Sequence, residues 1–163
     1  MTEQTAPSTP RDARGDPRRA PELDLGALPQ LLGFHLRLAQ VAFYRDFAAS
    51  LAHLDLTQKQ VAVLQIIEAN PGVSQVDVAA ALGTDRATMM AIVDRLEDRG
   101  LLARERSAAD RRRQELKLTL VGAGVLAEAL DAVAEHEARF KARFSDAELE
   151  ALTTALRRIH QQA

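Results

Sequence analysis

The stretch from Ser74 to Thr119 combines residue types and spacings that suit it to holding a DNA duplex. Two short segments with helical spacing of apolar residues end at Gly83 and Gly100, and glycine is the residue that most readily ends a helix. Two extended runs follow, joined by a segment that contains Asp110-Arg111-Arg112-Arg113. This order predicts two helices and a hairpin, in which the second helix fits a major groove and a cationic tip lies beside it.

The second short segment, residues 84–99, is the candidate for reading base pairs. Thr84 is predicted to cap this helix, and its apolar positions are predicted to form a buried stripe. The face left outward carries small or polar residues that let the backbone approach bases, namely Arg86, Ala87, Thr88, Met90, Ala91 and Arg95. Arginine can reach a guanine edge or a phosphate, and alanine can contact a thymine methyl group. An ordinary amphipathic helix with its charges in water would show the same pattern.

The predicted hairpin adds a second type of contact. An arginine at the tip of a two-stranded ribbon can enter the narrow minor groove, where the electrostatic potential is most negative. Arg106, Arg111, Arg112 and Arg113 supply the positive charge. Asp110 carries the opposite charge, which fits a carboxylate that orients an arginine by a charge-assisted hydrogen bond.

The charge of the 163-residue chain is unevenly distributed. The formal net charge is −2, which by itself argues against a nucleic-acid partner. Residues 99–117 nevertheless contain seven positive and three negative side chains, so this window carries +4 and the rest of the chain −6. A basic site on an acidic body is what phosphate contact requires. A solvated run of mixed charges is the simpler alternative.

The remaining sequence predicts mostly helices. Residues 1–21 are polar and rich in proline and arginine, which predicts a disordered tail. A long helix is expected over residues 25–54, and its wide apolar surface suggests that a second subunit covers it. Further helices are expected from residue 58 behind Thr57, from Ser74 with Val76 among its apolar positions, from Leu120 to about residue 144, and after the capping box that begins at Ser145.

Composition excludes several classes of protein. The chain has no cysteine, so disulfides, thiolate metal sites and thiol-based redox sensing are excluded. The four histidines show no metal-ligand spacing, and we expect neither a metal nor a cofactor. No apolar run approaches the ~20 residues that cross a bilayer. We therefore expect a soluble, cytoplasmic protein without a membrane segment. No phosphate-binding loop, nucleophile elbow or zinc-protease motif indicates an enzyme.

Several runs together resemble the MarR family of bacterial transcription regulators. They are Leu56-Thr57, Val63-Leu64, Asn70–Gln75, Ala79–Leu82, Val93–Leu102, Arg106, Asp110–Arg112 and Leu118-Thr119. The resemblance covers about residues 25–160, and its most specific parts are Gly100-Leu101-Leu102 and the Asp110-x-Arg112 pattern.

The resemblance implies a mainly α homodimer with a winged helix-turn-helix on each side. Residues 56–119 would form this DNA-binding domain, and residues 22–55 and 120–163 the intertwined helical dimerisation region. It also implies binding to pseudo-palindromic double-stranded operators, usually as a repressor that a small ligand releases. By the same resemblance Arg112 enters the minor groove and Asp110 braces it. Arg113 is an additional charge, so either arginine could lead the contact.

The resemblance places an effector near the junction of the first, second and fifth helices. The residues of this chain in that region are Phe34, His35, Leu38, Tyr44 and His53. Each of them could equally be an ordinary core or surface residue. The sequence of residues 32–40 resembles that of the family members that respond to aromatic acids or their coenzyme A thioesters. A different effector, or a helical module that binds protein instead of DNA, remains an alternative.

Overall fold

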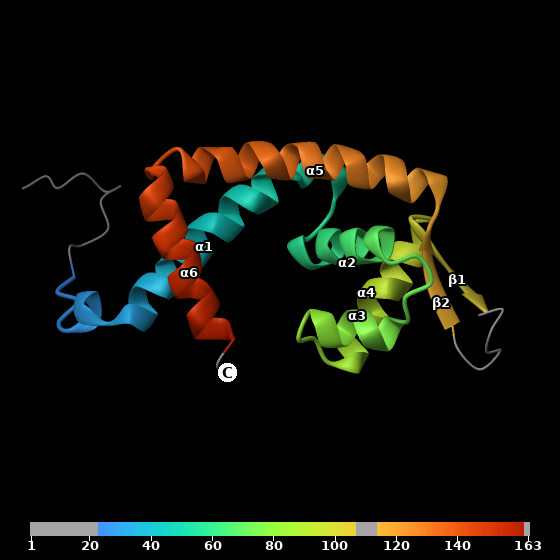
Figure 1. Cartoon of the computed structure of the whole chain (residues 1–163), viewed down its shortest axis with the longest axis horizontal. Coiled ribbons are helices and arrows are strands. Elements are labelled where there is room, and N and C mark those ends of the chain that lie inside the picture. Colours follow the sequence, from blue (N-terminus) through green and yellow to red (C-terminus); the bar gives the residue numbers. More distant parts are fainter. Residues whose placement is uncertain (1–22, 107–113, 162–163) are drawn as a thin grey trace, which may run out of the picture. The chain divides into compact units, whose positions relative to one another are not determined.

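The computed structural model describes residues 23–106 and 114–161. The described part is mostly helical, as the sequence predicts. In chain order its elements are η1 (Leu28–Gln30), α1 (Leu32–Ser50), η2 (Ala52–Leu54), α2 (Gln58–Ala69), α3 (Gln75–Ala81), α4 (Arg86–Asp98), β1 (Leu102–Arg106), β2 (Gln114–Leu118), α5 (Leu120–Lys141) and α6 (Asp146–His160) (Figure 1). The predicted tail, residues 1–21, lies outside the described residues.

The two glycines singled out in the sequence end α3 and α4 as predicted. Gly83 and Gly100 have positive φ values of 56° and 67°. After α4, the amide of Gly100 donates to the Glu97 carbonyl at 2.8 Å, and the amide of Leu101 donates to the Leu96 carbonyl at 3.0 Å. This pair of bonds is the Schellman arrangement, which satisfies the last carbonyls of a helix. The same pattern after α3 makes the tight turn of a helix-turn-helix.

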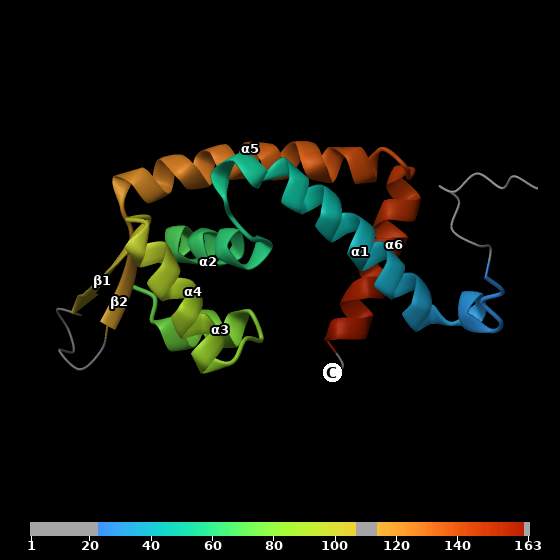
Figure 2. The same cartoon turned by 180° about the vertical axis from the view of Figure 1, so that it is seen from behind.

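Strands β1 and β2 form an antiparallel hairpin beside α4 (Figure 1 and Figure 2). Leu102 pairs with Leu118, and Arg106 pairs with Gln114 at the end of the described ladder. Residues 72–73 add a short further rung, because the Leu116 amide donates to the Val73 carbonyl at 2.9 Å. The buried side of the hairpin packs against the core that α2, α3 and α4 share.

That core is aliphatic and includes the stripe predicted for α4. Met89, Val93 and Leu96 are fully buried there. Thr57 begins α2 with a complete capping box, in which Thr57 and Gln60 each accept a hydrogen bond from the backbone amide of the other. The Thr57 cap and the glycines that follow α3 and α4 confirm that local sequence signals set the boundaries of these helices.

Two local predictions were wrong. The cap of α4 is Asp85 and not Thr84, because the Asp85 carboxylate accepts from the Thr88 amide at 2.9 Å. Val76 was predicted as an apolar position of α3, but it is 53% exposed. Helix α5 begins at Leu120 as predicted, and Leu120 itself is 95% exposed at this first helical position.

The single helix predicted over residues 25–54 is instead three elements. Residues Leu28–Gln30 form the 3-10 turn η1, and Leu31 is extended before α1 begins. After α1, η2 ends at Asp55, which adopts the left-handed conformation with φ of 49°. Asp55 is the one described residue other than glycine with a positive φ, and it makes the corner that redirects the chain into α2.

Helix α5 begins in close contact with the segment that leads into β1. Thr119 caps the helix, and its hydroxyl donates to the Gly100 carbonyl at 2.6 Å. Its amide also donates to the Leu101 carbonyl at 3.2 Å. Gly122 lies directly over the backbone of Leu101, where no Cβ would fit. The N-terminus of α5 is therefore fixed to the base of the hairpin by backbone contacts.

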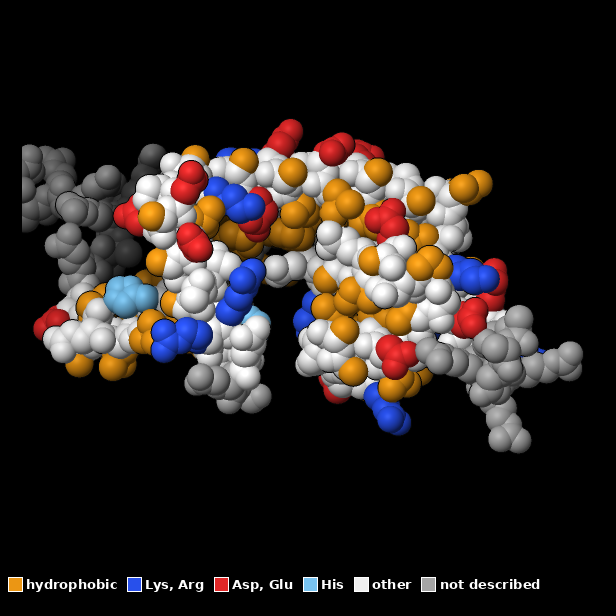
Figure 3. All heavy atoms as spheres, viewed as in Figure 1, with side chains coloured by type: hydrophobic (Ala, Val, Ile, Leu, Met, Phe, Trp, Pro, Cys, Tyr) orange, Lys and Arg blue, Asp and Glu red, His pale blue; other side chains and the backbone are white. Residues whose placement is uncertain are grey.

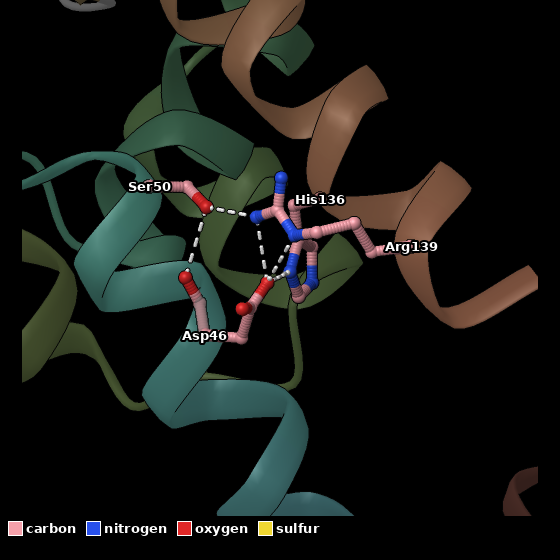
Figure 4. Close-up of polar contacts among 4 residues, drawn as sticks. All are labelled: Asp46, Ser50, His136 and Arg139. Atoms are coloured by element: carbon pink, nitrogen blue, oxygen red, sulfur yellow. Dashed lines mark hydrogen bonds and ion pairs between the residues drawn. The ribbon is translucent and has the colours of Figure 1, made fainter.

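A polar cluster joins α1 to α5 (Figure 4). Arg139 donates to Asp46 Oδ2 at 2.7 Å and to Ser50 Oγ at 2.6 Å. The Nδ1 atom of His136 lies 2.7 Å from the same Asp46 oxygen. His136 is fully buried beside three phenylalanine rings, and its Nε2 atom has no hydrogen-bond partner among the described residues. This contact orders the C-terminal half of α1.

The chain divides into two compact units, of which one ends at Leu36 and the other begins at Arg37. The first unit is rich in exposed apolar side chains before α1 (Figure 3). In the second unit, α6 has no buried residue although it carries Leu152, Leu156 and Ile159 on an amphipathic helix. Among the described residues, none of the helices is both long and apolar enough to span a membrane.

Candidate nucleic-acid interface

The outward face of α4 has the composition predicted for a base-reading helix. All six of the predicted residues are exposed: Arg86, Ala87, Thr88, Met90, Ala91 and Arg95. Neither Arg86 nor Arg95 forms a hydrogen bond or an ion pair with another described residue. Both guanidinium groups therefore keep all of their donors for an external anion.

The two threonines at the start of α4 are used within the protein. The Thr88 hydroxyl donates to Asp85 Oδ2 at 2.6 Å, and Thr84 donates to the Leu82 carbonyl at 3.3 Å. Thr88 is exposed, whereas Thr84 is half-buried. The hydrogen bonds from Thr88 lower the pKa of the Asp85 carboxyl. A cap that stays ionised fixes the first turn of α4, and it keeps one negative charge at the end of the helix where Arg86 begins.

The angle between the hairpin and α4 is set by Arg104, which sequence reasoning did not select as a site residue. Its guanidinium forms ion pairs with Asp94 and Glu97 on α4 and lies 3.4 Å from Gln75 Oε1 on α3. Burial opposes the charge of Arg104, but the hydrogen bond to Asp94 and the charge of Glu97 outweigh this effect and raise its pKa. The sequence signal for Arg104 is the pair Asp94 and Glu97, which lie about one helical turn apart and precede the strand that carries this arginine.

The hairpin places Arg106 at the outer end of β1, where it is exposed. The predicted tip residues Asp110, Arg111, Arg112 and Arg113 lie outside the described residues. Further along the strands, Lys117 donates to Glu105 Oε2 at 2.6 Å. This hydrogen bond raises the pKa of Lys117. Lys117 is thus engaged within the hairpin, although the sequence count treated it as part of the basic window.

The residues predicted to bind an effector occupy several different environments. In the first unit, Phe34 contacts the ring of His35, and His35 Nε2 lies 2.8 Å from the Pro29 carbonyl. In the second unit, Leu38 and Tyr44 are about half exposed on α1. His53 Nε2 in η2 lies 3.2 Å from Glu128 Oε1 on α5.

Sequence reasoning missed the polar cluster of α1 and α5, in which His136 is buried and Asp46 and Arg139 are partly exposed. From the sequence, the histidines are assessed only as metal ligands. The position of His136 on the inner face of α5 is the signal that could have predicted a buried polar contact. Its neighbour Asp46 has a lowered pKa, chiefly because of the hydrogen bonds from His136 and Arg139. Within residues 23–106 and 114–161, no group of three His, Asp or Glu side chains could hold a metal ion.

Known proteins share this arrangement. The sequence profile of the MarR family matches residues 54–113. A curated Thauera aromatica protein named for regulation of the hcr operon is 39% identical over 155 residues, which covers 93% of each chain. The structure of the transcriptional repressor CouR bound to a 23-mer DNA duplex is 40% identical with a TM-score of 0.81, and covers 85% of this chain and 99% of that chain.

Two further solved structures contain small molecules. CouR bound to p-coumaroyl-CoA is 37% identical with a TM-score of 0.80, and covers 87% of this chain and all of that chain. The PcaV transcriptional regulator from Streptomyces coelicolor, in complex with its natural ligand, is 30% identical with a TM-score of 0.74. That match covers 85% of this chain and 98% of the PcaV chain.

Proposed function

This chain belongs to the MarR family and is a DNA-binding transcriptional regulator, and on this premise we propose that it represses transcription until an aromatic effector releases it. In this proposal a homodimer binds a pseudo-palindromic operator. The effector is an aromatic carboxylate or its coenzyme A thioester. The protein has no catalytic role and acts in the cytoplasm.

The observation that carries the DNA-binding part is the exposed face of α4. Arg86 and Arg95 are free of other described residues and lie on the same helix as the small side chains of Ala87 and Ala91. We assign Arg86 to a guanine edge or a phosphate and Arg95 to a phosphate. The 40% identity to CouR, whose solved structure holds a DNA duplex, supports this assignment.

The hairpin is proposed to reach the adjacent minor groove. Arg106 lies at the outer end of the described ladder, and Asp110, Arg111, Arg112 and Arg113 follow it closely in the sequence. Arg112 is proposed to enter the groove with Asp110 as its brace, and Arg111 and Arg113 to contact the backbone.

The dimer is proposed to form through residues 22–55 and 120–163. Apolar side chains on α1 and α6 are 39–50% exposed, which is more than expected for a helix that packs only on its own chain. These side chains are Leu38, Val41, Leu152, Leu156 and Ile159. A twofold axis through this region would present two copies of α4 to major grooves about 34 Å apart.

The effector is proposed to bind near α1, with Phe34, His35, Leu38, Tyr44 and His53 contributing contacts. The likeness to CouR with p-coumaroyl-CoA and to PcaV with its ligand supports an aromatic molecule. Arg37 and Arg45 are exposed on α1 and could meet the phosphates of a thioester. Release follows if the ligand favours a spacing of the two α4 helices that no longer matches the grooves. A tenfold loss of operator affinity needs a preference of ~1.4 kcal/mol.

The test is binding of the full chain to the DNA upstream of its own coding sequence, measured by fluorescence anisotropy. We expect a log K against log salt slope of roughly −5 to −8 for the dimer. Addition of p-coumaroyl-CoA or p-coumarate should weaken binding, with coenzyme A alone as the matched control. A chain that is monomeric, or that ignores every upstream fragment at low salt, would refute the repressor function. Operator binding that none of the aromatic compounds alters would refute the effector class alone.

A further inference from the structure

The corner between α1 and α2 is held in an unusual conformation. It consists of η2 and Asp55, whose φ of 49° is a left-handed value that a side chain ordinarily disfavours. Such a conformation persists only where surrounding contacts impose it. Leu51, just before the corner, is fully buried and fixes one side of it in the core.

Arg99 supplies a contact that holds this corner from the other side. Its Nη1 atom donates to the Asp55 carbonyl at 2.7 Å, and its Nη2 atom donates to the Leu54 carbonyl at 2.8 Å. The two terminal nitrogens of the guanidinium therefore form a fork on two successive carbonyls. The residues joined are 44 and 45 positions apart in the sequence, so the fork is a tertiary contact.

The position of Arg99 makes this fork a contact of the recognition helix. Arg99 is the C-cap residue of α4, and its amide bonds to the Arg95 carbonyl at 3.3 Å. The Schellman bonds of Gly100 and Leu101 fix the backbone immediately after it. A side chain on such a fixed backbone transmits the position of the corner directly to the last turn of α4.

The same corner also contacts α5. His53 Nε2 in η2 lies 3.2 Å from Glu128 Oε1 of α5. The corner is therefore connected to α1 along the chain, contacts α5 through His53, and contacts α4 through Arg99. Arg104 serves a different purpose, because it ties the middle of α4 to the hairpin.

We propose that Arg99 is a positioning residue for operator recognition, which acts by fixing the C-terminal end of α4 to the α1–α2 corner. This inference rests on the proposed operator binding. The alternative role of Arg99 is a phosphate contact, as its place in the basic window suggests. The geometry disfavours that role, because both terminal nitrogens already donate to protein carbonyls.

The discriminating variants are Arg99→Lys and Arg99→Gln in the full chain. Lysine keeps the positive charge but presents a single nitrogen that cannot reproduce the planar fork. Glutamine removes the charge as well. Lys59→Gln is the matched control, since Lys59 is exposed on α2 and has no described hydrogen bond or ion pair.

Affinities for the operator and for a scrambled duplex of equal length separate the two roles. A positioning role predicts that Arg99→Lys and Arg99→Gln both lose about tenfold in operator affinity, ~1.4 kcal/mol, while binding to the scrambled duplex stays within about twofold. The salt slope of Arg99→Lys should equal that of the wild type. A phosphate contact predicts a different result: Arg99→Lys would retain operator affinity, and the salt slope of Arg99→Gln would be reduced by about one. This result would overturn the proposal.

Amide hydrogen exchange of the free protein tests the fork without DNA. The amides of Arg99 and Gly100 should exchange at least several-fold faster in both Arg99 variants and unchanged in Lys59→Gln. Failure of the wild type to bind any upstream fragment would refute the operator function but not the fork, which the exchange measurement decides by itself. Unchanged protection of these amides in Arg99→Lys would show that the fork does not hold α4, and the proposal would be wrong.

Discussion

Replacing Gly122 by alanine should destabilise the fold, although alanine is the better helix former. Gly122 is buried in the first turn of α5, directly over the backbone of Leu101. An ideal Cβ at this position would lie 2.7 Å from the Leu101 carbonyl carbon and nearer still to its oxygen. The obstacle is backbone, so it cannot move aside as a flexible side chain would.

The magnitude follows from the distance and from the bonds at risk. Carbon atoms in contact prefer about 3.5–4.0 Å, and the carbonyl oxygen of Leu101 is closer still, so the helix must shift by more than about 1 Å to accept the methyl group. Overpacking of this kind costs ~1–3 kcal/mol. The shift also strains two hydrogen bonds of Thr119 to the same segment, worth ~1–2 kcal/mol together. The helix propensity of alanine offsets ~1 kcal/mol of this cost, which leaves a net loss of about 1–4 kcal/mol.

Gly124→Ala is the matched control, because it lies in the same helix and its Cβ would meet nothing within 4 Å. We expect Gly124→Ala to stabilise the protein by ~0.5–1 kcal/mol and Gly122→Ala to lower the Tm by about 5–10 °C. Thermal unfolding followed by circular dichroism at one fixed protein concentration measures both, since an oligomer unfolds in a concentration-dependent way. Equal stability of the two variants would refute the close approach of α5 to the base of the hairpin.

Three further changes test separate parts of the molecule. Arg112→Ala should weaken operator binding by ~1–3 kcal/mol with the dimer intact, as anisotropy and gel filtration would report; unchanged affinity would contradict the minor-groove assignment. His136 and Arg139 lower the pKa of Asp46 below 3.8, so their contribution to stability is complete above that pH and is lost as the pH falls through the lowered value. The stabilities of the wild type and Asp46→Asn should therefore differ at pH 6, and the difference should shrink as the pH falls below 3.8 in urea titrations, whereas a constant difference would contradict this linkage. Thr57→Ala removes the cap of α2 and should cost about 1 kcal/mol of unfolding free energy, with an unchanged midpoint as the contrary result.

Local chemistry explains why several helix boundaries could be predicted from the sequence. Gly83 and Gly100 adopt positive φ values, and this left-handed backbone conformation ends a helix. The caps at Thr57, Ser74 and Ser145 likewise need only the residues of one turn. These signals are complete within a few positions of the sequence, so no tertiary information is needed to interpret them.

Predictions failed where two neighbouring residues could satisfy the same local need. Thr84 and Asp85 are both good caps, and the Schellman bond of the Thr84 amide to the Ala79 carbonyl assigns Thr84 to the turn, which leaves Asp85 as the cap. The deciding hydrogen bond comes from the end of α3, so the two candidates are distinguished only when the turn that precedes α4 is known.

The distribution of charge shows how a count of cations differs from a binding site. Three cations of the basic window are engaged within the protein, because Arg99 bonds two carbonyls, Arg104 bonds two carboxylates, and Lys117 bonds one. Carboxylates offset the charge of Arg104 and Lys117, whereas the carbonyls that bond Arg99 leave its charge intact but occupy its terminal nitrogens. Arg86 and Arg95 lie outside that window, and their side chains have no such partners among the described residues. We therefore expect Arg104 to orient the hairpin against α4, and the unpaired arginines of α4 to contribute to the salt dependence of DNA binding.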